Sequence, residues 1–327
     1  MARVAIIGAG IAGLVTAREL AARHDVVVFE KSRGVGGRMT TRYADNYVFD
    51  HGAQFFTART PEFQLYLRPL VDAGIVASWN CRFAEYERDE QTGTRQWGSD
   101  LPHYVGVPGM NAIGKWLAKD LDVRLETRVG SLQKPAGGWQ LIDDNGGDLG
   151  IFDWVILAAP AAQTTALLPA DCRIRRLSEP AVMLGCYSLM LADPRPLALE
   201  WDAALVRDAD ISWISVDSSK PGRPDEGFCM LVHSTNEWAD AYLDADDDWV
   251  MQHLLAETSV VLGVDARSAA HCTLHRWRYA NMDLRNTPGF SIDEDQQLGA
   301  CGDWFIRGRV EAAFTSATGL LKALPFS

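Results

Sequence analysis

The chain has 327 residues, 47% of them hydrophobic, and a formal net charge of −12. A chain of this length can bury a large core, as two domains or as one elaborate domain. A negative field of this size repels nucleic acid and acidic membranes, so we expect neither as a partner. Any phosphate group must then be bound locally, by backbone N–H groups and a few arginines.

The cysteines, histidines and apolar runs exclude several other classes. The six cysteines form no CxxC pair, so we expect reduced, mostly buried thiols in a reducing compartment. The histidines show no HExxH-like spacing, so we expect no metal site, and no GxSxG nucleophile elbow occurs. Residues 1–17 look like a signal peptide, but cleavage there would destroy a glycine motif. No apolar run reaches the ~18 residues of a membrane span, so we expect a cytoplasmic protein.

The first predicted elements are a short buried strand at residues 4–7, a glycine turn, and a helix that continues to about Arg23. Gly8 permits the turn, and Gly13 lets the helix pack against the strand. Gly10 lets the backbone approach a pyrophosphate, because a Cβ there would collide with the ligand. This pattern is typical of a dinucleotide site, although a glycine-rich turn in an ordinary α/β protein is the alternative.

The helix N-terminus, at Ile11 and Ala12, offers unpaired N–H groups and a positive dipole end to phosphate. A second strand is predicted at residues 26–30 and ends in Glu30. An acid in this place binds ribose hydroxyls. It also disfavours a ligand with a 2′-phosphate, so the pattern argues against NADP at this site.

The turn after Glu30, at residues 32–38, is rich in glycine and arginine. Gly36 and Gly37 permit backbone angles that are closed to other residues. Arg38 can then cross the pyrophosphate, because its planar fork suits phosphate oxygens. A basic surface loop is the alternative. Two weaker candidates, which fit a solvated side chain equally well, are Arg33 and Arg42.

An acid followed by this GGR turn resembles the pattern of amine oxidases and phytoene desaturases. In such flavoproteins the arginine lies over the FAD diphosphate, and the segment equivalent to residues 48–57 lies beside the flavin ring. Gly52 and Ala53 are then small where the ring needs room, and Gln54 can donate to a flavin carbonyl or a substrate amide. His51 is a candidate base or covalent tether, with a hydrogen-bonded structural histidine as the alternative. No cysteine resembles a covalent flavin site, so the FAD is expected to be non-covalent.

The middle of the chain predicts further elements of the nucleotide domain and then a change of pattern. We expect a turn and helix at residues 105–113, strands at 123–129 and 155–159, and part of a hairpin at 140–142. From residue 164 to 273, strand-like runs occur at 182–191, 211–216 and 228–233. Asp246 can cap a helix that extends to about Leu262 and has Trp249 among its apolar residues. We interpret this part as an antiparallel sheet with helices, forming a substrate domain.

The sequence contains eleven tryptophans, and some of them can line a pocket for a flat ligand. Core packing is the alternative for each of the candidates, Trp213, Trp238 and Trp277. Trp277 and Tyr279 rank first, because they precede the return of the chain towards the nucleotide domain.

The end of the chain predicts a strand at residues 298–302, then Asp303, then a helix from about Arg309 to Leu324. The helix has an apolar face, and Glu311 lies in its first turn. Asp303 is at the carboxyl end of its strand, where open α/β sheets bind ligands. A capping acid before a final amphipathic helix is the alternative. In similar FAD proteins the aspartate binds a ribityl hydroxyl, and the helix points its N-terminus at the flavin N1–C2=O region.

Over nearly its whole length the chain resembles the renalases in their bacterial form. The resemblance rests on IIGAGIAGL, EKSRGVGGRMTTR, FDHGAQFFTAR, VGVPGMNAI, HRWRYA and CGDWFIRGRVEAA. It implies an α/β fold with a Rossmann-type FAD-binding domain, p-hydroxybenzoate hydroxylase-like or amine oxidase-like, at residues 1–60, 100–163 and 274–327. A discontinuous α+β substrate domain, built on an antiparallel sheet, takes residues 61–99 and 164–273. The sequence departs from the family pattern at Ser316-Ala-Thr, where Ser-Gly is expected, and at residues 324–327.

The resemblance also implies an activity, the oxidation of 2- and 6-dihydro isomers of NAD(P) to NAD(P)+. Hydride passes to flavin N5, and dioxygen reoxidises the flavin to give hydrogen peroxide. Such a substrate needs no general base, because it leaves as an aromatic cation. The possible substrate-facing residues are Gln54, Trp277 and Tyr279. The implied FAD-binding residues are Gly8, Gly10, Ile11, Ala12, Gly13, Glu30, Lys31, Gly36, Gly37, Arg38, Gly52, Ala53, Gln54, Val129 (beside adenine), Gly302, Asp303, Arg309, Val310 and Glu311.

Two other functions stay open at this point. Flavin amine oxidases place a lysine near flavin N5, ahead of the closing motif, whereas this sequence has no lysine between Lys220 and Lys322. That absence counts against an amine oxidase without excluding it. A flavin-binding protein without turnover is the other alternative.

Overall fold

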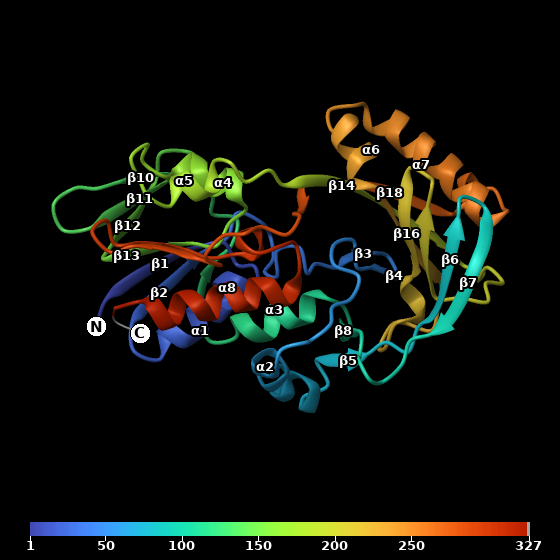
Figure 1. The fold of residues 1–327 in the computed structure, drawn as a ribbon, viewed down its shortest axis with the longest axis horizontal. Coiled ribbons are helices and arrows are strands. Elements are labelled where there is room, and N and C mark those ends of the chain that lie inside the picture. Colours follow the sequence, from blue (N-terminus) through green and yellow to red (C-terminus); the bar gives the residue numbers. More distant parts are fainter. Residues whose placement is uncertain (326–327) are drawn as a thin grey trace. The chain divides into compact units, whose positions relative to one another are not determined.

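The computed structural model describes residues 1–325 and divides them into two compact units (Figure 1). The first unit is discontinuous and comprises Met1–Met39, Ile113–Met183 and the chain from Asn281 onward. The second unit comprises Thr40–Ala112 and Leu184–Ala280. The α/β class expected from the sequence is confirmed, with a mainly parallel sheet in one unit and a mainly antiparallel sheet in the other.

The boundaries of the units differ from those expected. Residues 40–60, 100–112 and 274–280 belong to the second unit, and residues 164–183 belong to the first. One reason lies in Asp50, which accepts hydrogen bonds from Thr41 and from the backbone N–H of Met110 and pairs with Arg223. These bonds tie the segment after Met39 to the second unit. Binding roles for the two units stay a prediction.

The first unit is built on a six-stranded sheet in the order β19-β20-β13-β1-β2-β9. All neighbouring pairs run parallel except β19 and β20. Its strands are β1 (Arg3–Ile7), β2 (Asp25–Phe29), β9 (Asp122–Arg124), β13 (Trp154–Leu157), β19 (Ser291–Asp293) and β20 (Leu298–Ala300). Continuous apolar runs such as Val4–Ile7 are buried, as expected where helices cover both faces of a parallel sheet.

Of the five helices described in this unit, the first and the last lie close to their predicted ranges, whereas those at residues 161–167 and 175–178 were not predicted. They are α1 (Ile11–Ala21), α3 (Asn111–Ala118), α4 (Ala161–Leu167), α5 (Arg175–Ser178) and α8 (Val310–Ala323), with a short 3-10 turn η3 (Asp303–Phe305). α3 starts two residues before the boundary of the unit. α1 and α8, from opposite ends of the sequence, pack side by side (Figure 1). Residues 326–327, part of the expected departure at the C-terminus, lie outside the described residues.

A three-stranded antiparallel sheet completes the first unit, and here one prediction was wrong. Its strands are β10 (Val129–Gln133), β11 (Trp139–Asp143) and β12 (Asp148–Phe152). The predicted strand 123–129 is in fact two strands, β9 and β10, separated by a turn. Glu126 has a φ of 52°, in the left-handed region, which breaks the extended path.

The second unit is built on a seven-stranded sheet in the order β18-β14-β17-β16-β15-β6-β7. The pairs β14–β17, β17–β16, β16–β15 and β6–β7 are antiparallel, and β15–β6 is parallel. The strands are β6 (Arg82–Glu87), β7 (Glu90–Gln96), β14 (Leu184–Asp193), β15 (Ala203–Arg207), β16 (Ile211–Val216), β17 (Phe228–Ser234) and β18 (His271–Asn281). The three strand-like runs read from the sequence correspond to β14, β16 and β17.

Helices α6 (Asn236–Ala241) and α7 (Asp247–Leu262) pack on one face of this sheet and share a core with it. Alternation along β16 shows both faces, because Ile214 lies in that core whereas Trp213 packs in a separate aromatic cluster. Asp246 caps α7 as predicted, accepting the N–H groups of the next turn. Trp249 is 47% exposed, so its expected place among the apolar residues of α7 does not make it part of the core.

The remaining elements of the second unit are short. They are β3 (Arg42–Ala44), β4 (Tyr47–Phe49), α2 (Pro61–Asp72), β5 (Val76–Ser78), β8 (Tyr104–Gly106), η1 (Asp217–Ser219) and η2 (Ala266–Ser268).

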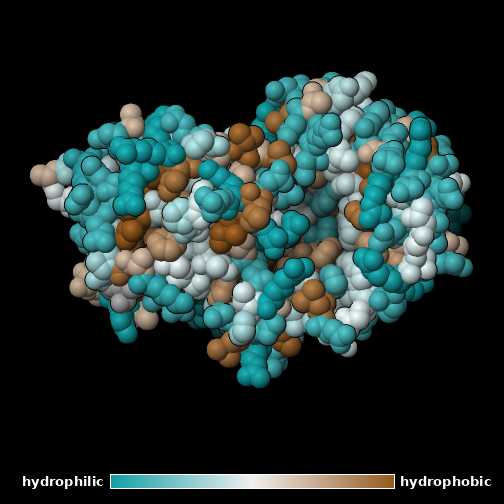
Figure 2. Space-filling model, viewed as in Figure 1, coloured by the Kyte–Doolittle hydropathy of each residue, from teal (hydrophilic) through white to brown (hydrophobic). Residues whose placement is uncertain are grey.

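All six cysteines are free and five are buried, which confirms that part of the sequence prediction. On the face drawn in Figure 2, hydrophilic residues predominate and hydrophobic ones are scattered. Within residues 1–325, no helix combines the length and the apolar character needed to cross a bilayer.

Candidate functional site

The two sequence signatures meet at one edge of the first unit's sheet. β1, β2, β13 and β20 run parallel, so their carboxyl ends lie together. The glycine turn at Gly8 follows β1, Glu30 follows β2, and Asp303 comes shortly after β20. In open α/β sheets this edge is where ligands bind. The fold therefore brings residues from both ends of the chain to the place where a dinucleotide is expected.

The glycines of the first turn have distinct surroundings. Gly8 has a φ of 109°, and a Cβ added at Gly13 would lie 2.0 Å from the Gly8 carbonyl oxygen. These two glycines are therefore required by the fold itself. A Cβ added at Gly10 meets no protein atom within 4 Å. The protein thus leaves open space at Gly10, which fits a phosphate approaching the N-terminus of α1 at Ile11 and Ala12.

Glu30 is buried, and backbone N–H groups hold its carboxylate. Oε2 accepts the N–H of Ala9 at 2.8 Å, and Oε1 accepts the N–H of Ser32 at 2.8 Å. Each carboxylate oxygen keeps a second lone pair, so the group can still accept a ribose hydroxyl. Lys31 is exposed beside it. Val129 opens β10 two residues after Thr127, whose N–H donates to the Glu30 carbonyl oxygen, so the two predicted residues lie in connected segments.

The glycine-arginine turn folds back on the first glycine turn. The N–H of Gly36 donates to the Ala9 carbonyl oxygen at 2.8 Å. Gly36 and Gly37 both have positive φ, 108° and 58°. A Cβ added at Gly37 would lie 3.2 Å from the Gly10 Cα, so the two turns are in contact. Arg33 is exposed.

Arg38 and Asp303, predicted separately for one ligand, form a bidentate ion pair. Arg38 Nη1 lies 2.8 Å from Asp303 Oδ2, and Nη2 lies 2.6 Å from Oδ1. The Asp303 side chain is 7% exposed and that of Arg38 29%. A paired fork of this kind is stronger than a neutral hydrogen bond and fixes the plane of the guanidinium. The pair therefore joins Arg38 of the N-terminal glycine-arginine turn to Asp303 of the C-terminal motif.

The N-terminus of α8 completes this edge. Arg309 is the exposed N-cap, and Val310 and Glu311 form the first turn. The N–H of Gly302 donates to Ser316 Oγ at 2.8 Å. Ser316, where the sequence departs from the family pattern, therefore anchors the end of β20 to α8.

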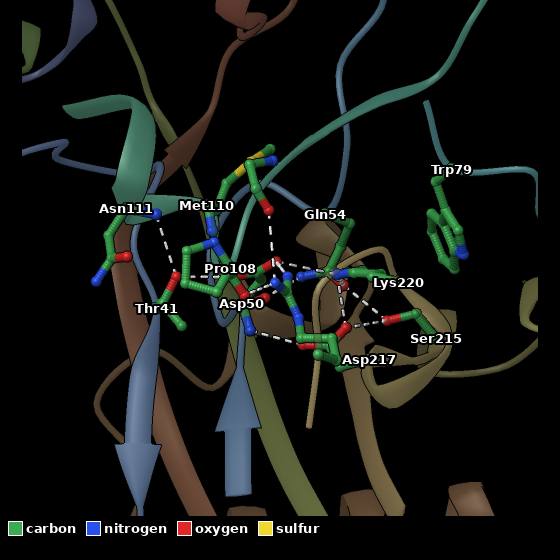
Figure 3. Close-up of polar contacts among 12 residues, drawn as sticks. Thr41, Asp50, Gln54, Trp79, Pro108, Met110, Asn111, Ser215, Asp217 and Lys220 are labelled. Carbon is green, nitrogen blue, oxygen red and sulfur yellow. Dashed lines mark hydrogen bonds and ion pairs between the residues drawn. The ribbon is translucent and has the colours of Figure 1, made fainter. Parts of the chain in front are cut away.

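In the second unit, the loop at residues 50–54 rests on a buried group of charges, which we call the charge cluster (Figure 3). Its members are Asp50, Asp217, Lys220 and Arg223, each with a side chain at most 1% exposed. Asp50 pairs with Arg223, and Asp217 Oδ1 lies 2.6 Å from Lys220 Nζ. Burial raises the pKa of Asp217, while Lys220 and Arg223 lower it. Two cations thus offset two carboxylates.

Lys220 was missed by the sequence reasoning as a site residue. Its Nζ lies 2.6 Å from Asp217 Oδ1, 3.2 Å from Gln54 Oε1 and 3.5 Å from Asp50 Oδ2. These three acceptors match the three protons of its ammonium group. The local Asp-x-x-Lys spacing in the sequence is a weak signal for the pair, because the other partners are distant in sequence.

Gln54 is buried, and hydrogen bonds within the second unit use its whole amide. Nε2 donates to the carbonyl oxygens of Asp50 and of Gly52, the latter at 3.2 Å. Oε1 accepts from Ser215 Oγ at 2.7 Å and from Lys220. The predicted donation to a flavin or a substrate therefore requires the exchange of one of these bonds.

His51 lies in a group of aromatic rings. Its ring stacks on Trp277 at 5.5 Å and meets His275 edge-on at 4.9 Å. Burial, reinforced by His275 and Arg42, lowers the pKa of His51 to about 3. Burial likewise lowers the pKa of His275 to about 4. Both rings are neutral at neutral pH, so neither is a strong base there.

The other aromatic residues predicted to face a ligand lie on different elements of the second unit. Trp277 and Tyr279 lie on β18, and Trp277 Nε1 donates to the His51 carbonyl oxygen at 2.8 Å. Gly52 and Ala53 are half-buried in the loop directly after His51. Trp238 lies on α6 and belongs to the core that α6 and α7 share with the sheet, so core packing, the alternative for this residue, is what the structure shows.

A possible metal-ligand group lies elsewhere in the second unit. One ligand atom each from Asp210, His253 and Glu257 lies within 4.8 Å of the others. His253 Nε2 makes a 2.7 Å hydrogen bond to Asp210 Oδ2, which links α7 to the turn between β15 and β16. This bond accounts for the contact without an ion, and the expectation of no metal site stays a prediction.

The two glycine environments generate a first prediction. We expect the Gly10→Val protein to fold but to purify without yellow colour, because the new Cβ enters ligand space and meets no protein atom within 4 Å. Gly13→Val is the matched comparison and should lower the melting temperature sharply, since its Cβ clashes with backbone. Absorbance near 450 nm and thermal unfolding are the readouts. Full flavin occupancy in Gly10→Val would remove Gly10 from the ligand site.

The ion pair generates a second prediction. Arg38→Ala should weaken FAD retention, roughly tenfold or more, because it removes a bidentate cation worth ~1.5–3 kcal/mol. Flavin release would be followed by fluorescence during dilution. Arg33→Ala, in the same turn but exposed, is the control and should keep wild-type retention. Unchanged FAD affinity in Arg38→Ala would contradict the assignment.

The buried imidazoles generate a third prediction. The folded pKa values of His51 and His275, about 3 and 4, lie below the usual ~6.5. The unfolded chain therefore binds more protons below pH 6.5, so stability is complete above that pH and falls towards pH 4. Each histidine contributes up to about 1.4 kcal/mol per pH unit. Thermal unfolding from pH 7.5 to 4.5 should show a shallower loss in His275→Asn than in the wild type; equal slopes would contradict these pKa values.

Comparison with known proteins agrees with this architecture. A sequence model described as NAD(P)-binding Rossmann-like domain matches residues 6–70, and one described as flavin containing amine oxidoreductase matches residues 70–287. A stretch of 51 residues is 45% identical to 4,4'-diapophytoene desaturase of Staphylococcus aureus (strain Newman). It represents 15% of this chain and 10% of the desaturase, so the desaturase's own activity does not transfer.

Solved structures share the fold over almost the whole chain. A putative protoporphyrinogen oxidase from Exiguobacterium sp. 255-15 has a TM-score of 0.77 at 12% identity, with 98% of this chain and 97% of that chain covered. A triple mutant of putrescine oxidase has a TM-score of 0.73 at 14% identity, with 100% and 99% covered. The family match at residues 70–287 covers most of the chain and includes every strand of the second unit's seven-stranded sheet. The chain therefore belongs to the flavin-containing amine oxidoreductase family, as an FAD-dependent oxidoreductase.

Proposed function

We propose that this protein is an oxidase of isomeric dihydronicotinamide dinucleotides, returning 2- and 6-dihydro NAD(P) to NAD(P)+. Bound FAD supplies a hydride acceptor at N5 and delivers the electrons to dioxygen, giving hydrogen peroxide. The first unit would hold the FAD non-covalently, through the residues at its sheet edge. The second unit would hold the substrate, with Trp277 and Tyr279 as candidate contacts.

The residues of the first unit fit FAD in several independent ways. Gly10 leaves room beside the N-terminus of α1, and Glu30 keeps lone pairs for ribose hydroxyls. The Arg38–Asp303 pair puts a cation for the diphosphate next to an acceptor for the ribityl chain. The N-terminus of α8 adds a positive dipole end at the same edge.

The observation that carries the choice of substrate is the weak basicity of the second unit. Burial lowers the pKa of His51, His275 and His233 to between about 3 and 4. Lys220 has acceptors for all its protons. An amine is protonated at neutral pH and must lose a proton before it is oxidised, whereas a dihydropyridine gives up hydride and becomes an aromatic cation. Weak bases therefore favour the dihydropyridine.

An amine oxidase is the second candidate. It is favoured by the family description and by the fold shared with putrescine oxidase. Against it stands the engagement of Lys220 with Asp217 and Gln54, because a lysine so bonded does not take a proton from a substrate without first breaking an ion pair. A flavin-binding protein without turnover is the remaining alternative.

The test mixes the yellow protein with 2- and 6-dihydro NAD isomers, with ordinary 4-dihydro NADH and with a series of amines. We expect the dihydro isomers to bleach the flavin anaerobically and to release peroxide in air. The rate constant for bleaching should be nearly constant from pH 6 to 9, because the substrate transfers no proton to a histidine or lysine. Bleaching by amines alone, with a rate that rises with pH, would establish the amine oxidase instead; bleaching by neither class would support a binding protein.

A further inference from the structure

Two residues that each carry a buried polar atom without a partner lie opposite each other on the second unit's sheet. Trp213 on β16 and His233 on β17 are direct cross-strand partners. Directly opposed residues of an antiparallel pair project from the same face, with Cβ atoms ~4.5–5.5 Å apart. Trp213 Nε1 and His233 Nε2 are both shielded from solvent and make no hydrogen bond within residues 1–325. Buried polar atoms without partners are rare, because each one costs the free energy of its lost hydration.

The two atoms have opposite hydrogen-bonding character. The indole Nε1 of Trp213 can only donate. The ring of His233 hydrogen-bonds to the backbone of His51, and that bond raises its pKa, so the ring is the donor there. Burial outweighs this effect and lowers the pKa to about 4, so the ring is neutral. A neutral imidazole that donates through one nitrogen accepts through the other, which makes Nε2 an acceptor.

This sheet face is separate from the one that α6 and α7 cover. Trp213 packs in an aromatic cluster with Phe55 and Trp97, whose ring centroids lie 5.6 Å and 6.3 Å from its own. On the other side of His233, its partner on β14 is Ser188, whose Oγ donates to the His51 carbonyl oxygen at 2.7 Å. The donor and acceptor therefore lie between aromatic rings and the loop at residues 50–54.

We propose that Trp213 and His233 together bind a planar primary carboxamide of the ligand. Trp213 Nε1–H donates to the carboxamide oxygen, and His233 Nε2 accepts from its NH2 group. This inference rests on the proposed function, since the nicotinamide ring carries such a group, and it names the residues that recognise it.

Other ligand groups fit the pair less well. A carboxylate has no hydrogen for His233, and the nearby cations Lys220 and Arg223 are already paired with Asp217 and Asp50. An ammonium group has no acceptor for the Trp213 N–H. Either group would leave one member of the pair buried without a partner, which a carboxamide does not.

The test measures binding of NAD+ and of 3-acetylpyridine adenine dinucleotide to the FAD-loaded protein, by the change in flavin absorbance. The analogue carries CH3 in place of the amide NH2, so it keeps the bond to Trp213 and loses the bond to His233. We expect the wild type to bind NAD+ about tenfold more tightly, equivalent to ~1.4 kcal/mol. His233→Phe should reduce that ratio to about one, and His233→Gln, which retains an acceptor, should restore part of it. Trp213→Phe should weaken both ligands and leave the ratio unchanged.

Two controls come from the helix-covered side of the same sheet. Trp238→Phe and His253→Gln change the same residue types there and should keep both affinities. A wild type that binds the two dinucleotides equally, or binds neither, would overturn the inference, as would a His233→Phe protein that keeps the full preference. If His233→Phe does not fold, His233→Gln and Trp213→Phe decide. Turnover of the dihydro isomers, assayed separately on the same wild-type protein, tests the proposed function, so its failure is told apart from a failure of carboxamide recognition.

Discussion

The ion pair between Arg38 and Asp303 is the interaction on which the account of the first unit depends. It joins residues 265 positions apart and brings the two nucleotide signatures into contact. The parallel order β20-β13-β1-β2 makes this possible, because all four strands deliver their carboxyl ends to one edge. α1 and α8 pack together and hold the two helix N-termini on the same side. A ligand that carries a diphosphate next to a polyhydroxyl chain then meets donors and acceptors in a fixed order.

In the second unit, the charge cluster supports the loop at residues 50–54. A buried charge is costly unless it is paired, and here two carboxylates form ion pairs with two cations. Gln54 connects this network to the backbone of the loop. Its amide NH2 donates to two carbonyl groups of the loop, and its amide oxygen accepts from Ser215 and Lys220. The histidines next to the loop stay neutral, so the unit offers shape and hydrogen bonds in place of strong bases. That division suits chemistry carried by a cofactor.

Local signals in the sequence predicted much of the fold. The strand, glycine turn and helix at the N-terminus were predictable because the need for glycine at positions 8 and 13 arises within the motif itself. A Cβ at Gly13, for example, would clash with the Gly8 carbonyl. Asp246 was recognised as a cap for the same reason, since its partners lie within one helical turn. The break between β9 and β10 was not predictable. The alternation of charged and uncharged residues continues unbroken past Glu126 in the sequence, whereas the φ angle of Glu126 is in the left-handed region.

The candidate site was predictable only where its motifs are local. Gly10, Glu30, Arg38 and Asp303 each stand in a recognisable motif, although their meeting depends on sheet order. Lys220 and His233 stand in no such motif. Asp50, one partner of Lys220, is 170 positions away in sequence, and His233 faces Trp213 across a pair of strands. The compact units divide the chain differently from the expected domains for a similar reason, since Asp50 follows the nucleotide signature in sequence but bonds to Met110 and Arg223 of the second unit.

The central claim is that one FAD spans the sheet edge from the glycine turn to Asp303. It is tested most directly by calorimetric titration of the flavin-free protein with FAD, ADP and riboflavin. The account predicts one FAD per chain, which displaces both ADP and riboflavin, with ADP affinity sensitive to Glu30→Gln and riboflavin affinity sensitive to Asp303→Asn. Simultaneous binding of FAD and ADP to the same chain would show that the two signatures serve separate sites, and would contradict it.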